Sequence, residues 1–190
     1  MTPFGPPRAV ARLLGGLDVP WFIAGGWALD LFLGRETRAH EDVEIAILRR
    51  DQAAVRRHLA GWEFLKVASG AREVWPEDER LDPPIHEIHA KGNREPRDLE
   101  ILLNESDGEL WKFRRDPRVT RPVSEIGDRS DLGIPFLRPE IVIPYKAKQP
   151  RERDEVDYRL VHPALAGRAR EWLRVALEVA HQGHPWIEKL

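Results

Sequence analysis

The residues from Trp21 to Leu48, WFIAGGWALDLFLGRETRAHEDVEIAIL, carry the strongest pattern in this sequence. The first four are apolar and suit a short strand. A glycine pair at 25–26 follows, where a backbone must turn sharply or approach a ligand closely. Residues 27–33 suit a helix that ends at Gly34. After a basic turn, a second strand is expected over 42–47.

The acidic pair Asp42 and Glu44 lies on that second strand. Side chains alternate between faces along a strand, so both carboxylates project from the same face, about 7 Å apart. A hard divalent cation such as Mg²⁺ prefers carboxylate oxygens and also binds phosphate. A solvated edge strand could carry the same pair, and for an isolated D-x-E it is the simpler interpretation. The preceding glycine pair, with Arg38 and His40, favours the metal site.

A second acidic strand is predicted over residues 97–103, RDLEILL. Its apolar side chains alternate, and Asp98 and Glu100 share the opposite face. If this strand lies beside the one that carries Asp42, four carboxylates converge and raise each other's pKa unless cations neutralise them. The alternative is two unrelated amphipathic strands that expose their acids to water. The residues alone do not choose between the two.

The run GGWALD, followed by G-x-x-T-R-x-H-x-D-x-E, resembles the signature of the polymerase-β-like nucleotidyltransferase superfamily. More narrowly, it is similar to the aminoglycoside and lincosamide nucleotidyltransferases, which modify antibiotics. That branch usually has two aspartates in the metal pair, whereas this chain has Asp42 and Glu44. Residues 139–158, PEIVIPYKAKQPRERDEVDY, are similar to the C-terminal signature of the same branch, with Lys146 at the matching position.

The resemblance implies an enzyme that moves a nucleoside monophosphate, AMP from ATP or from another NTP, to a hydroxyl group of a small molecule. Two Mg²⁺ ions are expected, held by Asp42 and Glu44. The superfamily places a third carboxylate on a later strand between apolar neighbours. Asp98 and Glu100 both fit that pattern, as metal ligand and as general base, and the sequence does not choose between them.

Five residues are expected to contact the nucleotide. The backbone N–H groups of Gly25 and Gly26 would approach the triphosphate near a helix N-terminus, which favours anions. Arg38 and His40 lie in the basic turn, and Lys146 matches a phosphate-binding lysine of the branch. For Lys146 the alternative is a surface ion pair with the acidic residues that follow it.

The acceptor that the resemblance implies is an aminoglycoside or a lincosamide. A second hypothesis is a nucleotidyltransferase that acts on a protein or on RNA, as toxin-type members of the superfamily do. A third is a non-catalytic nucleotide-binding module with the same fold, which the glutamate at position 44 would support.

Two histidines lie in the strand expected over residues 85–90. The H-x-x-H spacing of His86 and His89 suits neither one face of a strand nor the i, i+4 pairing of a helical zinc site. Zinc is therefore not expected from this motif. The interpretation is a strand whose polar face looks into or beside a cleft.

The composition excludes several classes of protein. The 190 residues contain no cysteine, which excludes disulfides, a thiolate nucleophile and a cysteine-based zinc site. A net charge of −2 argues against nucleic acid as the partner. The N-terminus lacks the apolar core of a signal peptide, and no apolar run is long enough for a membrane span. A cytoplasmic protein is expected.

The predicted fold class is α/β (α+β): a small mixed sheet that carries the acids, backed by helices. Residues 1–135 would form the catalytic domain, and residues 136–190 a C-terminal helical segment that closes one side of a cleft. Further helices are expected over residues 8–17, 51–59 and 163–180, and from 138 with a kink or early end at Pro144. Further strands are expected over 62–67 and 109–114, with connecting segments at 69–84, 104–107 and 116–135.

Overall fold

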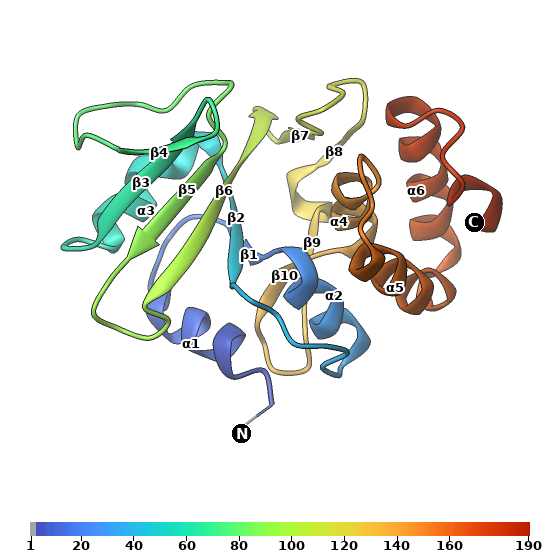
Figure 1. Cartoon of the computed structure of the whole chain (residues 1–190), viewed down its shortest axis with the longest axis horizontal. Helices are drawn as coiled ribbons and strands as arrows, with labels where there is room; N and C mark the ends of the chain where they lie inside the picture. The colour runs from blue at the N-terminus through green and yellow to red at the C-terminus, as the bar shows by residue number, and fades with distance from the viewer. Residues whose placement is uncertain (1–2) are drawn as a thin grey trace.

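A mixed β-sheet flanked by helices forms the centre of the molecule, and the computed structural model describes residues 3–190 (Figure 1). The strands follow the order β4-β3-β5-β6-β2-β1-β10-β9 across the sheet. They are β1 (Trp21–Ile23), β2 (Glu44–Leu48), β3 (Glu63–Ala68), β4 (Ala71–Val74), β5 (Glu87–Lys91), β6 (Asp98–Asp107), β9 (Gly127–Arg129) and β10 (Pro135–Leu137). A ribbon of β7 (Leu110–Lys112) and β8 (Thr120–Pro122) extends from β6.

The strands that carry Glu44 and Glu100 are neighbours in the sheet. This is the arrangement that convergence of the acids requires, and not the alternative of two unrelated strands. β2 pairs in parallel with β6, and Glu44 lies directly opposite Glu100. The apolar residues of both strands are buried on the face that packs into the core, among them Ile45, Ile47 and Ile101. Because the side-chain period of a strand is two, burying these residues places the acids of β2 and β6 together on the other face.

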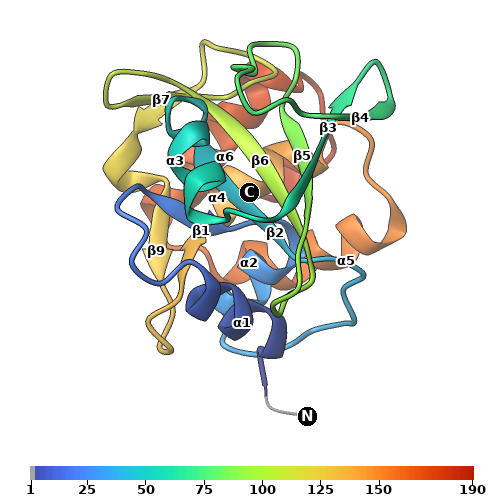
Figure 2. The same cartoon turned by 90° about the vertical axis from the view of Figure 1, so that its left-hand side faces the viewer.

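The helices lie on either side of the sheet. They are α1 (Gly5–Leu13), α2 (Gly25–Leu33), α3 (Gln52–His58), α4 (Pro139–Lys146), α5 (Glu152–Val161) and α6 (Gly167–Ala180). In Figure 1, α4, α5 and α6 gather on the right beside α2, which contacts both α4 and α5. Figure 2 shows α1 and α3 toward the viewer, where the His58 ring contacts the main-chain oxygen of Leu13.

Helix α2 begins two residues earlier than predicted, at Gly25 instead of Trp27. Gly25 has a φ of 58°, in the left-handed region that disfavours any residue with a side chain. The helix ends as predicted, with Gly34 in the left-handed conformation at its C-terminus. The glycine pair is therefore the first turn of the helix, and it follows directly from β1.

Three connecting segments contain more regular structure than predicted. Residues 116–135, expected as a link, contain β8 and β9 and the first residue of β10, which joins the sheet parallel to β1. Residues 104–107, expected as a turn, continue β6, because this end of the strand pairs with β7. Residues 69–84, expected as a loop, contain the edge strand β4. Each added strand other than β6 is three or four residues long, too short for a clear periodic pattern.

The C-terminal helices depend on apolar side chains spaced three and four residues apart. In α6, Leu173, Ala176 and Leu177 are buried, and the helix begins at Gly167, four residues after the predicted start. Helix α4 keeps Pro144 in its last turn and ends shortly after it, at Lys146. None of the helices in residues 3–190 has the length and the apolar character that a bilayer span requires.

Candidate active site

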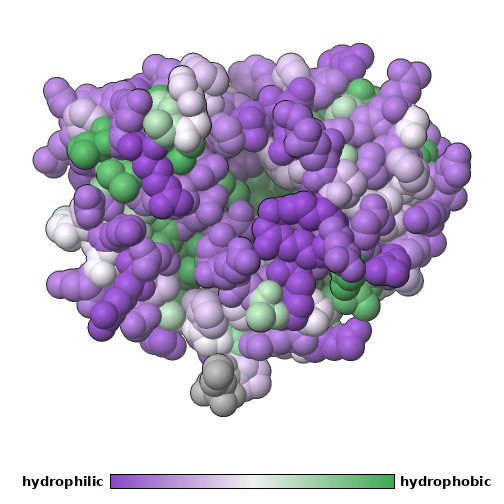
Figure 3. Space-filling model, in the orientation of Figure 1, coloured by the Kyte–Doolittle hydropathy of each residue, from purple (hydrophilic) through white to green (hydrophobic). Residues whose placement is uncertain are grey.

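A cavity of about 680 Å³ lies between the sheet and the C-terminal helices. Figure 3 shows this face hollowed near its centre, with hydrophilic side chains around the hollow and hydrophobic ones at its floor. Its walls come from the start of α2, from β2, β5 and β6, and from α4 and the segment that follows it. We call the side formed by β2, β5 and β6 the sheet wall, and the side formed by α4, the segment after it and the start of α5 the helical wall.

Asp42, Glu44, Glu87 and Glu100 are among the carboxylates that line this cavity. Glu44 and Glu100 are partly buried on neighbouring strands, Glu87 comes from β5 on the far side of β6, and Asp42 lies at the exposed rim. Burial raises the pKa of Glu44, and the charge of Asp42 raises it further. Burial, together with the charges of Glu44 and Glu87, raises the pKa of Glu100 to about 8.

These acids are poorly neutralised by the protein itself. Within residues 3–190, Asp42, Glu44 and Glu100 form no ion pair with a lysine, arginine or histidine. Carboxylates that crowd together in a partly buried site are stabilised by a cation that they can share. Hard oxygen donors in this arrangement fit Mg²⁺, which binds through one or two carboxylates together with water and phosphate oxygens.

The glycine pair makes room for the site. A Cβ atom at Gly25 would overlap the carboxylate of Glu44. A Cβ atom at Gly26 would lie 2.5 Å from Nδ1 of His40 and 2.7 Å from Nη2 of Arg38. No side chain fits at either position without moving these groups, and both glycines line the cavity.

The basic turn is held in place by Asp30, a buried residue of α2 that is not among the predicted site residues. Its carboxylate accepts hydrogen bonds from the backbone N–H and hydroxyl of Thr37, and contacts Nε2 of His40 at 2.7 Å. The His40 ring packs 4.4 Å from that of Trp27, and the Trp27 indole donates to the main-chain oxygen of Asp42. Asp30 ends the GGWALD run, so its position in the motif was the available signal.

Two cations at the cavity edge are bound to α5. Arg38 donates two hydrogen bonds of 3.0 Å to Asp157. Lys146 lies 2.8 Å from Asp154 and 2.9 Å from Asp157. Although burial opposes it, hydrogen bonds from Arg151 and Lys146 lower the pKa of Asp154 to about 2. The ion pair that was the alternative for Lys146 is present, and both cations also line the cavity.

Asp98 lies apart from the other candidate residues. Its side chain is 77% exposed, and its nearest charged partner is Nζ of Lys91, 3.9 Å away. It does not line the larger cavity, whereas Glu100, two residues further on, does. The two acids share a face of β6, but Asp98 is the first residue of the strand, where that face opens to solvent.

The cavity also carries positive charge outside the predicted site residues. Arg114, Arg115, Lys148 and Tyr145 are among the residues that line it. Arg115 donates to the main-chain oxygen of Tyr145 and lies over its ring. No motif marks these residues, because the chain brings them to the cavity only through the β7–β8 ribbon and α4.

Comparison with known proteins gives a consistent result. The model of the aminoglycoside-2''-adenylyltransferase family matches residues 8–75, a span that contains the glycine pair, the basic turn and the acids Asp42 and Glu44. No curated protein matches the chain significantly. Among solved structures, ANT(2'')-Ia in complex with adenylyl-2''-tobramycin aligns with 90% of this chain and 94% of its own, at 19% identity and a TM-score of 0.58.

The chain has the nucleotidyltransferase fold. The lincosamide adenylyltransferase LnuA, bound to lincomycin, aligns with 88% of this chain and 93% of its own, at 17% identity and a TM-score of 0.54. An antigenic nucleotidyltransferase-like protein from Paracoccidioides brasiliensis covers 98% of this chain and 92% of its own, at 16% identity and a TM-score of 0.51. The resemblance to the aminoglycoside and lincosamide nucleotidyltransferase branch is confirmed, and with it the α/β fold class.

Proposed function

We propose that this protein is a Mg²⁺-dependent nucleotidyltransferase that moves AMP from ATP to a hydroxyl group of a small antibiotic-like acceptor. The observation that carries the proposal is the register of β2 and β6, which sets Glu44 beside Glu100 in a cavity that begins at the glycine pair. The family model and the folds of ANT(2'')-Ia and LnuA support the same reaction class.

Asp42 and Glu44 would hold the metal. Both line the cavity, both offer hard oxygen donors, and the buried carboxylate of Glu44 lacks a cationic partner among the described residues. When bound, Mg²⁺ supplies positive charge that offsets the phosphate charge and the charge that develops on the leaving pyrophosphate. The longer side chain of Glu44 fits here because Gly25, directly beside it, has no side chain.

Glu100 would act as the general base. A base works best when its pKa lies near the working pH, and that of Glu100 is raised to about 8. As the acceptor oxygen bonds to the α-phosphorus, Glu100 takes the hydroxyl proton, and the bond between the α-phosphorus and pyrophosphate breaks. Asp98, the other candidate, is exposed and lies outside the cavity, so we assign it no role in this step.

The nucleotide would lie along the start of α2. The backbone of Gly25 and Gly26 faces the cavity at the N-terminus of this helix, a position that favours anions. Arg38, His40 and Lys146 line the same region and would face the phosphates. We also assign residues 1–135 to a catalytic domain and residues 136–190 to the helical segment that supplies the opposite wall.

The proposed acceptor class follows from the ligands bound in the similar solved structures. ANT(2'')-Ia binds adenylyl-2''-tobramycin and LnuA binds lincomycin, so hydroxyl-bearing antibiotics of these two classes are the first candidates. The cavity carries both acidic and basic side chains, and the presence of Arg114 and Arg115 in its lining argues against a purely polycationic ligand. A lincosamide-like acceptor therefore agrees better with the lining than an aminoglycoside does.

The proposed reaction is tested by measuring pyrophosphate release with Mg²⁺-ATP and a panel of lincosamides and aminoglycosides. Release that requires both the acceptor and Mg²⁺ is expected, and mass spectrometry should show an acceptor heavier by one AMP unit. AMP incorporated into the protein or into RNA instead would favour the toxin-type hypothesis. ATP that neither reacts nor raises the melting temperature would overturn the proposal.

A further inference from the structure

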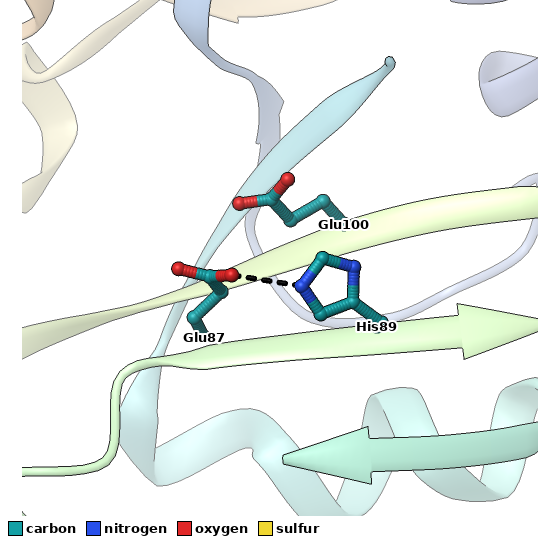
Figure 4. Close-up of side chains that lie close together, drawn as sticks. All are labelled: Glu87, His89 and Glu100. Atoms are coloured by element: carbon teal, nitrogen blue, oxygen red, sulfur yellow. Dashed lines mark hydrogen bonds and ion pairs between the residues drawn. The ribbon is translucent and has the colours of Figure 1, made fainter. Parts of the chain in front are cut away.

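Glu87 and His89 of β5 and Glu100 of β6 form a compact group of potential metal ligands (Figure 4). One oxygen or nitrogen atom from each lies within 4.8 Å of the others. Oε1 of Glu87 is 2.8 Å from Nε2 of His89. All three side chains are partly buried, so they are ordered by their strands and still reachable by a small ion.

The strand register produces this group. Glu87 and His89 are two residues apart and therefore share one face of β5. In the antiparallel pairing of β5 with β6, His89 lies directly opposite Glu100. His86, the other member of the H-x-x-H motif, points elsewhere, and its Nδ1 contacts the main-chain oxygen of Pro84. The motif that predicted no zinc site thus contributes one histidine to a ligand set whose third member comes from another strand.

The donor types favour a different cation from the one at the acidic pair. Mg²⁺ takes oxygen ligands, whereas an imidazole with two carboxylates suits Zn²⁺ and similar first-row transition metals. A smaller hollow of about 370 Å³, lined by His89 and Glu100, opens on one side of the group, and Glu87 faces the larger cavity on the other. Three protein ligands reachable from two sides leave room for water or another ligand at a fourth position.

We propose that Glu87, His89 and Glu100 form a second metal site, selective for Zn²⁺ over Mg²⁺, and that its occupation inhibits the enzyme. Inhibition follows because Glu100 belongs to both sites: as a zinc ligand it no longer accepts the proton of the acceptor hydroxyl. The zinc-binding part rests on the ligand geometry alone. The inhibition part rests on the proposed function.

Zinc binding is tested first, by calorimetry on the metal-free full-length protein without nucleotide. One Zn²⁺ per chain is expected, together with a rise in melting temperature that the same concentration of Mg²⁺ does not produce. His89→Ala should weaken zinc binding at least about tenfold, the lower end of what even outer-shell changes cost. His86→Ala, the matched control on the same strand, should bind zinc like the wild type, and so should Glu44→Gln.

Cobalt provides a measurement that does not depend on how well a variant folds. Co²⁺ added to the wild-type protein should give visible absorption bands of a coordinated ion, and Zn²⁺ should remove them. Absence of zinc binding by the wild type would overturn the site. Unchanged binding in His89→Ala, or loss caused by His86→Ala instead, would overturn the ligand assignment.

Inhibition is tested separately, as the ratio of turnover with and without Zn²⁺ at saturating Mg²⁺-ATP. A ratio well below one is expected for the wild type, and a ratio near one for His89→Ala. A wild type that binds zinc with full turnover would overturn the inhibitory role and leave the site. A protein that binds zinc as predicted but never turns over ATP would contradict the proposed function and not the metal site.

Discussion

The two walls of the cavity differ in how their charges are balanced. On the sheet wall, Glu44 and Glu100 lie side by side with no ion-pair partner among residues 3–190, and the pKa of each is raised. On the helical wall, Lys146 contacts two aspartates at 2.8 and 2.9 Å, and the pKa of Asp154 is lowered to about 2. The acids of the first wall repel one another, whereas those of the second are paired with cations. The unpaired acids, and not the paired ones, are therefore the basis of the proposed metal site.

The largest effect is expected on the sheet wall, for turnover. Asp42→Asn keeps the shape of the side chain and removes its charge, so the proposed metal loses a ligand. Turnover should fall by at least about 10³-fold, the upper range for loss of one group that stabilises the transition state. Pyrophosphate release measures it. An unchanged melting temperature would show that the fold is intact, and full activity in this variant would remove Asp42 from the site.

On the helical wall, a substitution is expected to lower stability, whereas on the sheet wall it lowers turnover and leaves the fold intact. Asp157→Asn leaves Arg38 without its partner and Lys146 with one aspartate instead of two. The free energy of unfolding should fall by about 2 kcal/mol, less than loss of a fully buried pair because Asp154 remains. Urea denaturation measures it. The control is Glu109→Gln in the exposed pair with Arg50, which should change the free energy by less than about 0.5 kcal/mol.

A smaller effect is expected in the pH dependence of stability, which the sheet wall should influence through Glu100. The folded protein holds the Glu100 proton more tightly than the unfolded chain does, since the pKa rises from 4.5 to about 8 on folding. Stability therefore falls as the pH rises through that range. Glu100→Gln removes this loss, so at pH 8.5 the metal-free variant should melt about 2–4 °C above the wild type. At pH 5 the two should melt together, and a gain of equal size at both pH values would exclude a charge effect.

The smallest effect is expected at the end of β6. Asp98 is exposed and paired only loosely with Lys91, so Asp98→Asn should alter turnover less than about twofold. Glu100→Gln, two residues away on the same face, should lose most of its activity. Comparing the two variants in the pyrophosphate assay tests which acid serves as the base. Equal losses of turnover in the two variants would contradict the assignment of Glu100 alone as the base.

Much of the sheet wall could be predicted because its signals are local. Asp42 and Glu44 both line the cavity, although β2 begins at Glu44 and not at residue 42 as predicted, so that Asp42 lies just before the strand. A glycine pair marks the start of α2. The choice between Asp98 and Glu100 depends on register, which joins residues far apart in the sequence and leaves no local trace. The same holds for Glu87, which was placed on a strand but not beside Glu100.

The helical wall was harder to predict for a similar reason. The resemblance predicts a phosphate contact for Lys146, and its acidic neighbours in sequence give a surface ion pair as the alternative. The structure shows ion pairs with Asp154 and Asp157 that are largely buried, in a residue that also lines the cavity. Asp30 has no charged neighbour within four residues in either direction, and its role appears only when the basic turn folds back onto α2. The strand β10 consists of three residues, and its pairing with β1 spans more than 100 residues of chain.

Binding of Mn²⁺ together with a non-hydrolysable ATP analogue, followed by electron paramagnetic resonance, tests the metal assignment most directly. We predict that the wild-type protein immobilises Mn²⁺ when the analogue is present, that Asp42→Asn and Glu44→Gln lose most of this binding, and that Asp98→Asn keeps it. Binding that survives loss of both Asp42 and Glu44 would contradict the assignment of these two carboxylates as metal ligands.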